Sequence, residues 1–347
     1  MNFACSKIKI NYMKLRKIVA LFSLLIFTCF SISAQTFTIE MSKKINPIAF
    51  IKTEKAFLLV SDTAIFSFDK KAWKPIKLFY KKINTAAFVD NKVWLGGFNK
   101  LFYLDEKTND LVFWKGLNDG NIDVLSLQTN IKTQELLVAS ADDGAFSFKN
   151  DVISNNYVSH IRAEDVCACG GYTWVGTNTG LVRLDKKGKI QVYAEEGVGG
   201  FEIPDNLVSR LECIDGQHLL VIMPEALAFL DADEKNTSSH AEGFEFLGKK
   251  GNLIFDAVRT SDGDLLFLTE DGLIYMNRKE ISEHHEHGAS IEVYSNAGKP
   301  AISKIKNPLL GESVWEKGYF DDKGNLWLAS ALHVLKVSKN EWKKMLK

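Results

Sequence analysis

The chain has 347 residues, and its 43 basic and 43 acidic side chains give a formal net charge of zero at neutral pH. Lys and Arg do not gather into a stripe with interleaved aromatic residues, which is the pattern that binds a phosphate backbone. The composition therefore indicates a globular protein, and we expect no nucleic acid among its partners.

The first 34 residues predict a secretory signal peptide that is removed after export. Lys14, Arg16 and Lys17 precede the apolar run 18–27, and small residues at 31–34 offer a cleavage site. The apolar run is shorter than the roughly 20 residues that a membrane-spanning helix needs. We therefore expect no transmembrane helix in the mature chain.

Lipid attachment at Cys29 is an alternative fate for this leader, although Phe27 and Thr28 are poor neighbours for it. Loss of the leader removes five basic residues and leaves 38 basic against 43 acidic ones, a net charge of −5. The mature protein, residues 35–347, is therefore expected in the periplasm, on the cell surface or outside the cell.

An early stretch and a late stretch of the mature chain look like strands. Residues 36–40 alternate polar and apolar side chains, and we expect them to complete the last unit of the fold. Residues 341–346 are predicted as the outer strand of that same unit. Such closure would remove the free sheet edges that otherwise invite aggregation.

A pattern of twelve residues recurs along the chain, and its clearest copy is 174–185. Two apolar stretches flank a tight turn, which predicts a two-stranded hairpin. Further copies lie at 58–69, 94–105, 220–231, 266–277 and 327–338, and a weaker one runs from Leu137 or Val138 to Lys149. Their intervals of roughly 35 to 60 residues bracket the length of a four-stranded propeller blade. We predict an all-β fold, a single β-propeller of seven blades made of four-stranded antiparallel sheets, over residues 35–347.

The longest interval between copies separates Leu266 from Trp327. It contains another strand-like stretch at 291–294, followed by a segment with Pro300 and Pro308. This interval is either a protruding loop or a decayed eighth blade.

Three cysteines remain in the mature chain, Cys167, Cys169 and Cys213. An odd number cannot pair completely, and Cys167 and Cys169 lie two apart on one predicted strand, where they cannot easily bridge. We therefore expect small, buried, free thiols rather than a metal or redox site.

A histidine-rich segment, His284, His285 and His287, is the one candidate for metal binding. It falls in a predicted surface loop with no matching ligand elsewhere, so a solvated loop is favoured over a metal site. The sequence nominates no catalytic residue and implies no cofactor.

Polar residues at the predicted turns would face one end of the channel. In a propeller, the turns between second and third strands and the connections into each inner strand meet at one mouth. We predict ligand-binding residues there, namely Asn99, Asp143, Asn178, Asp205, Asn206, Glu225, Asp271, Trp315 and His333. Amides, carboxylates and an aromatic ring suit a hydroxyl-rich ligand, although each polar residue also suits a turn that binds its own backbone.

Segments 172–185, 203–208 and 321–328 resemble the two-component regulator propeller repeat. The resemblance implies a β-propeller like those in the extracytoplasmic sensors of hybrid histidine kinases in Bacteroidota, many of which recognise oligosaccharides. The same repeats also occur in secreted propellers that lack a kinase.

Three functions follow from the fold and the resemblance. The favoured one is a secreted or periplasmic, non-enzymatic propeller that binds a glycan, a peptide or an envelope protein through the mouth of its channel. A propeller lyase or hydrolase, with mouth carboxylates and His333 as acid and base, is an alternative. A scaffold for envelope or secretion machinery is the third.

Overall fold

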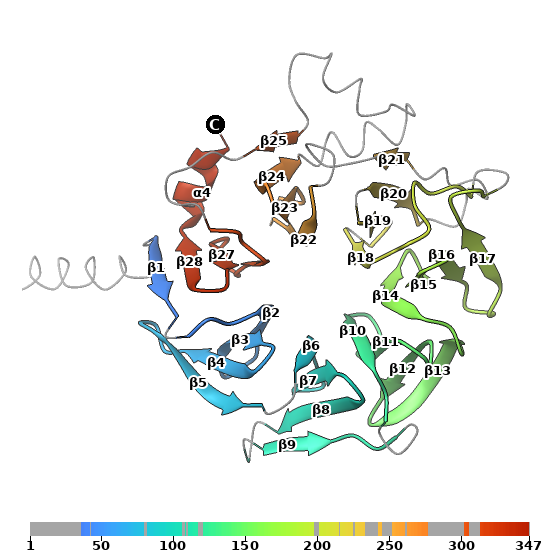
Figure 1. The fold of residues 1–347 in the computed structure, drawn as a ribbon, viewed down its shortest axis with the longest axis horizontal. Coiled ribbons are helices and arrows are strands. Elements are labelled where there is room, and N and C mark those ends of the chain that lie inside the picture. The colour runs from blue at the N-terminus through green and yellow to red at the C-terminus, as the bar shows by residue number, and fades with distance from the viewer. Residues whose placement is uncertain are drawn as a thin grey trace, which may run out of the picture.

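The computed structural model describes residues 36–346, with gaps at 42, 80–81, 106–107, 109, 117–120, 198–200, 215, 225, 233–241, 245–251, 261, 277–301 and 305–312. The described strands form seven four-stranded antiparallel sheets, arranged as a ring around a central channel (Figure 1). The chain is therefore a seven-bladed β-propeller, as the repeat predicts. We number the blades 1 to 7 in chain order.

Each blade contributes one strand to each of four concentric positions. The inner strands are β2 (Pro47–Lys52), β6 (Ile83–Val89), β10 (Val124–Asn130), β14 (Ala163–Cys169), β18 (Arg210–Cys213), β22 (Ile254–Arg259) and β26 (Lys317–Phe320). The second strands are β3 (Phe57–Ser61), β7 (Lys92–Gly97), β11 (Glu135–Ser140), β15 (Tyr172–Thr177), β19 (His218–Ile222), β23 (Leu265–Thr269) and β27 (Leu326–Ala329).

The outer half of each blade follows the same order. The third strands are β4 (Ala64–Phe68), β8 (Lys100–Asp105), β12 (Ala145–Lys149), β16 (Gly180–Leu184), β20 (Leu227–Asp231), β24 (Gly272–Met276) and β28 (His333–Val337). The fourth strands are β5 (Trp73–Leu78), β9 (Asp110–Phe113), β13 (Val152–Val158), β17 (Ile190–Tyr193), β21 (Glu242–Phe244), β25 (Ile302–Lys304) and, for blade 7, β1 (Phe37–Glu40). Every copy of the twelve-residue pattern begins within the second strand of a blade.

The second strands are apolar on both faces because adjacent blades cover both. Leu220 and Ile222 of β19 pack in one cluster with Leu265 and Phe267 of β23, so blades 5 and 6 share a core. All five residues of β23 are buried. Burial of this kind explains why these strands are continuous apolar runs instead of alternating patterns.

A hydroxyl closes the turn between the second and third strands in five blades. The side chains that do so end the second strand or directly follow it, and each donates to the backbone carbonyl of residue i+3 or i+4: Ser61, Ser140, Thr177, Thr269 and Ser330. In blade 4 the turn ends at Gly180, whose φ of +129° favours glycine. These turns account for the polar centre of the repeated pattern.

The ring closes by pairing the two ends of the described chain. Strand β1 pairs with β28, with Phe37 opposite Lys336 and Glu40 opposite His333, which confirms the closing strand (Figure 1). The prediction of a strand at 341–346 is wrong, because β1 already occupies the outer position of blade 7.

Those late residues belong instead to helix α4 (Lys339–Met345). Ser338 caps the helix by accepting a hydrogen bond from the Glu341 N–H. Trp342 is buried and packs against Tyr275 and Phe320. The apolar residues of this segment are therefore covered by blades 6 and 7 without joining a sheet.

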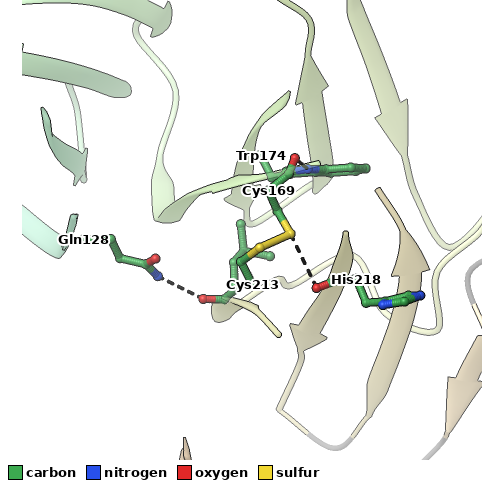
Figure 2. Close-up of a disulfide and its surroundings, with 6 residues drawn as sticks. Gln128, Cys169, Trp174, Cys213 and His218 are labelled. Atoms are coloured by element: carbon green, nitrogen blue, oxygen red, sulfur yellow. Dashed lines mark hydrogen bonds between the residues drawn. A yellow bond between two sulfur atoms is a disulfide. The ribbon is translucent and has the colours of Figure 1, made fainter. Parts of the chain in front are cut away.

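The prediction that Cys169 and Cys213 are free thiols is also wrong. They are the last residues of β14 and β18, and they form a disulfide with Cα atoms 5.4 Å apart (Figure 2). The inner strands of adjacent blades end side by side, so the partner of Cys169 comes from the next blade and not from its own strand. Cys167 is buried and free, as expected.

Two faces of the ring follow from the strand directions. Turns between second and third strands lie on the same face as the connections into each inner strand, and we call this the entry face. The other connections lie on the opposite face, where the disulfide joins the ends of β14 and β18. No helix among the described residues is long and apolar enough to cross a membrane.

Candidate functional site: the channel mouth

The channel contains two adjoining cavities, of about 430 and 290 Å³. Residues of inner strands line them, and both cavities are bounded by Arg210, Glu212 and Lys317. Arg210 and Lys317 are the first residues of β18 and β26, so their side chains belong to the end of the channel at the entry face. The charged part of the channel therefore lies at the predicted mouth.

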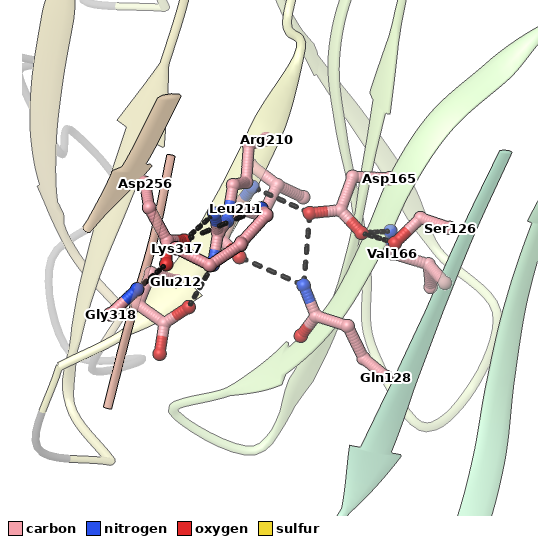
Figure 3. Close-up of polar contacts among 10 residues, drawn as sticks. All are labelled: Ser126, Gln128, Asp165, Val166, Arg210, Leu211, Glu212, Asp256, Lys317 and Gly318. Carbon is pink, nitrogen blue, oxygen red and sulfur yellow. Dashed lines mark hydrogen bonds and ion pairs between the residues drawn. The ribbon is translucent and has the colours of Figure 1, made fainter. Parts of the chain in front are cut away.

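Asp256 of β22 joins three blades at this point (Figure 3). It forms an ion pair with Arg210, and its Oδ1 atom lies 3.7 Å from the Nζ of Lys317. Its Oδ2 accepts a hydrogen bond of 2.9 Å from the Gly318 N–H. The Asp256 side chain is only 4% exposed, whereas 31% of Arg210 and 24% of Lys317 are exposed. The two cations therefore still reach the cavity.

A second carboxylate, Asp165 of β14, joins blades 3, 4 and 5. It accepts hydrogen bonds from the Ser126 hydroxyl and the Gln128 amide, at 2.5 and 2.9 Å. The Leu211 and Val166 N–H groups donate to it as well, each at 2.8 Å. Four donors saturate this carboxylate, so it positions the strands and leaves little capacity for a ligand.

The carboxyl groups of the mouth differ in their protonation. Burial raises the pKa of Glu212 to about 7, and Asp256 and Asp165 add to the shift while Arg210 opposes it. Burial acts in the same direction on Asp256, but Arg210 and Lys317 outweigh it and hold its pKa below the ordinary value. Near neutral pH, Glu212 can therefore accept or donate a proton while Asp256 stays ionised.

These groups give the mouth donors and acceptors in close proximity. Arg210 and Lys317 donate, and Glu212 accepts when ionised and donates when protonated. Among the described residues, no three His, Cys, Asp or Glu side chains are grouped so that they could hold a metal ion. The arrangement suits a polar ligand that presents several hydrogen-bonding groups.

The structure places most of the sequence-predicted residues on the entry face, outside the two cavities. Asn99, Asp143, Asn178, Asp271 and His333 lie in or next to turns between second and third strands. Their part in binding stays a prediction. Asn99 has a φ of +57° and Asp143 donates its N–H to Ser140, which are turn-forming roles.

Asp205 and Asn206 lie in the connection from β17 to β18, also on the entry face. Asp205 accepts a hydrogen bond of 2.9 Å from the Leu207 N–H, and Asn206 accepts one of 2.8 Å from the Glu195 N–H. Asp205 therefore holds its own turn, and Asn206 ties the end of this connection to a residue eleven positions earlier.

Trp315 requires a correction. Its side chain is only 3% exposed and packs with Leu268 and Leu328 in the core that blades 6 and 7 share. A ring covered in this way does not offer a stacking surface to a ligand. Glu225 and the three histidines His284, His285 and His287 lie outside the described residues.

Sequence reasoning missed the charged residues of the inner strands. The signal was present as Arg210 and Glu212, two apart in a short strand, and as the adjacent acids Glu164 and Asp165. Residues two apart on a strand face the same side. Which side faces the channel depends on the register, and the sequence does not fix it.

No protein-family model and no curated protein matches the sequence. Solved structures match it as a fold. An extracellular domain assigned to a hybrid two-component system of B. thetaiotaomicron superimposes with a TM-score of 0.65 and 14% identity, over 87% of this chain and 39% of that one. A second such domain gives a TM-score of 0.63 and 11% identity, over 87% and 42%.

A lyase and a WD40 propeller domain share the same architecture. The virginiamycin B lyase of Staphylococcus aureus gives a TM-score of 0.62 and 10% identity, over 88% of this chain and 99% of that one. The WD40 propeller domain of Doa1 gives 0.60 and 13%, over 89% and 97%. Identities this low show the fold alone. The chain spans about two fifths of the length of these two extracellular domains, and its class is the seven-bladed β-propeller.

Proposed function

We propose that this chain is an exported, non-enzymatic binding protein that holds a glycan, a peptide or a partner protein at the entry-face mouth of its channel. The observation that carries the proposal is the partly exposed set of Arg210, Glu212 and Lys317 beside one cavity. A convergent polar group in a concave site is the usual form of a binding site.

Two further observations support export. The basic and apolar segments before Gln35 have the form of a signal peptide. The disulfide between Cys169 and Cys213 is a bond that persists in oxidising compartments such as the periplasm. Mass spectrometry of the protein isolated from a fractionated cell, showing a chain that begins at Gln35 outside the cytoplasm, would support this part of the proposal.

The binding part is tested with the chain from Gln35 onward. Glycan arrays and pull-down from envelope extract identify a ligand, and calorimetry then compares the wild type with Lys317→Gln and Glu212→Gln. We expect each variant to bind at least about tenfold more weakly, since each replaces an ionisable hydrogen-bonding group of the mouth by a neutral amide.

The matched control is Lys187→Gln, which removes a similar charge from an exposed turn on the opposite face. It should bind as the wild type does. If both ligand screens are blank, or if Lys317→Gln binds as tightly as Lys187→Gln, the proposed site is wrong.

An enzymatic function has one observation in its favour, the pKa of about 7 at Glu212. A carboxyl group that titrates near neutral pH beside Arg210 can serve as a general acid or base. A lyase or hydrolase of this kind would turn over a polysaccharide, and Glu212→Gln would abolish that turnover even at saturating substrate. Turnover that survives the substitution would remove Glu212 as the acid or base.

A further inference from the structure

Large apolar side chains are exposed unevenly on the two faces of the ring. Among the described residues, eleven such side chains are exposed, and seven lie in connections of the entry face or at a strand end beside one: Leu78, Phe98, Ile161, Leu207, Leu253, Val314 and Leu332. Connections and strand ends on the opposite face carry three, Ile131, Val152 and Ile190. Exposed apolar residues scattered singly need no explanation, but a concentration on one face does.

Four of the seven form an ordered set. Ile161, Leu207, Leu253 and Val314 lie in the successive connections that enter blades 4, 5, 6 and 7, between one and three residues before each inner strand. We call these four residues the aliphatic arc. The inner strands that follow carry Asp165, Arg210, Asp256 and Lys317, so the arc borders the charged side of the channel mouth.

Negative charge accompanies the apolar residues. The described residues in the connections of the entry face include eleven acidic and five basic side chains. The described connections of the opposite face, together with helix α4, include ten acidic and eleven basic side chains. Individual contacts repeat this pairing. The Leu253 carbonyl accepts a hydrogen bond of 2.9 Å from the Glu270 N–H, and the Leu207 N–H donates a hydrogen bond to the Asp205 carboxylate.

The acids also crowd one another on this face. Burial and then the neighbouring Asp142 raise the pKa of Asp123, although Arg162 opposes the shift. Burial likewise raises the pKa of Glu316, with Asp62 adding to the effect against Lys317 and Lys44. Like charges held together attract a partner of opposite charge.

The aliphatic character of these exposed residues favours a polypeptide over a glycan as the partner. Sugar rings stack on flat aromatic faces, and only Phe98 among the seven exposed residues is aromatic. Branched aliphatic side chains instead pack against the side chains of another polypeptide. A second copy of this chain is disfavoured face to face, because two acidic surfaces would then meet.

We propose that the aliphatic arc and the acids around it dock a basic, amphipathic segment of another polypeptide, with Leu, Ile or Val on one side and Lys or Arg on the other. This extends the proposed function, since it names the chemistry of a protein partner at the same mouth. Apolar packing holds the segment, and the acids orient it and exclude acidic competitors.

The test uses the full chain from Gln35 and a synthetic peptide of Leu and Lys, about 18 residues or five helical turns long. Fluorescence anisotropy should show binding of this peptide. A Leu and Glu peptide should not bind, and an oligolysine of equal length should bind at least about tenfold more weakly because it lacks the apolar side. Binding of oligolysine as tight as that of the Leu and Lys peptide would overturn the proposal.

Variants locate the surface. Leu207→Ser with Leu253→Ser should weaken peptide binding at least about tenfold, and Glu196→Lys with Glu270→Lys should do the same through charge. The control pair, Ile131→Ser with Val152→Ser, removes two even more exposed aliphatic residues from the opposite face and should bind as the wild type does. Equal loss in the arc and control pairs would overturn the proposal.

Further outcomes separate this inference from the proposed function. If the wild type binds a channel ligand that Lys317→Gln loses, but does not bind the Leu and Lys peptide, the inference fails and the proposed function stands. Self-association of the chain that Leu207→Ser with Leu253→Ser abolishes would assign the arc to a second copy and overturn the inference. Glycan binding lost in the same pair would also overturn it.

Discussion

Arg210 of blade 5 and Asp256 of blade 6 form an ion pair across the boundary between two blades, at the end of the channel that faces the entry loops. The pair is unequal, because the Asp256 side chain is 4% exposed and that of Arg210 is 31% exposed. Asp256 is thus a buried anion whose partners, Arg210 and Lys317, keep contact with solvent. Loss of the anion and loss of a cation should therefore have different consequences.

Asp256→Asn should destabilise the protein by about 2 kcal/mol. The substitution leaves Arg210 and Lys317 without their shared counter-charge, and the cost is lower than the roughly 3–5 kcal/mol of a fully buried pair because both cations reach water. Urea unfolding measures the change. Asp322→Asn, in an exposed turn of the opposite face, serves as the control and should stay within about 0.5 kcal/mol of the wild type. Equal stability of the two variants would contradict the assignment.

Glu212 should make the protein less stable as the pH rises from 4.5 to about 7. Within this window the native state keeps a proton on Glu212 that the unfolded chain, with the ordinary pKa of 4.5, has already released. More protons bound to the native state means that the free energy of unfolding falls with rising pH. The lowered pKa of Asp256 has the opposite effect, because it stabilises the folded state at neutral pH. This stabilisation is lost only as the pH falls below the ordinary pKa of 3.8.

The Glu212→Gln variant isolates this effect. Unfolding free energies of both proteins are measured from about pH 5 to pH 8. The value of the wild type should fall relative to that of the variant as the pH rises, because only the wild type carries a titrating side chain at this position. Other titrating groups cancel in the comparison. Parallel slopes for the two proteins would show that the pKa of Glu212 is not raised in the folded state.

The fold was accessible from the sequence because it repeats. A hairpin of fixed length recurs, and each copy, from Leu58 to Trp327, is a buried second strand followed by a tight turn and a third strand. In five of the blades a hydroxyl closes that turn. The wrong prediction of a strand at 341–346 has a local cause. A short amphipathic stretch fits either a strand or a helix, and Ser338 with Glu341 forms a cap that only the helix uses.

The residues of the channel mouth were harder to predict from the sequence, because turn residues are recognisable by residue type and the charged residues of inner strands are not. Turn residues such as Asn99 and Asp205 stand out by type, yet Asn99 supplies the positive φ of its turn and the Asp205 side chain binds the backbone of its own loop. Arg210 and Lys317 look like ordinary strand-end charges until the ring closes around them. The partner of Cys169 was hidden for the same reason, since this contact between adjacent blades joins residues 44 positions apart.

The Cys169–Cys213 disulfide should stabilise the ring by about 3–4 kcal/mol, since it closes a loop of 44 residues between blades 4 and 5. Cys213→Ser should lower the free energy of unfolding by that amount, and the wild type in reductant should match the variant. Alkylation of the unfolded chain from Gln35, without reductant, should label Cys167 alone. Three labelled thiols in protein isolated from the periplasm would contradict the bond.

Strand β1 should be required for closure, because it is the only described strand of blade 7 that comes from the N-terminal end of the chain. Deletion of residues 37–40 exposes the edge of β28 and uncovers Trp327, against which Phe37 packs. We expect the shortened protein to unfold at lower denaturant concentration and to aggregate through that edge.

A synthetic peptide of residues 35–41, added in trans, should restore the monomer and part of the stability by pairing with β28. A peptide of the same composition in scrambled order is the control and should restore neither. A shortened protein that stays monomeric and as stable as the full chain would mean that the ring is held closed without this strand.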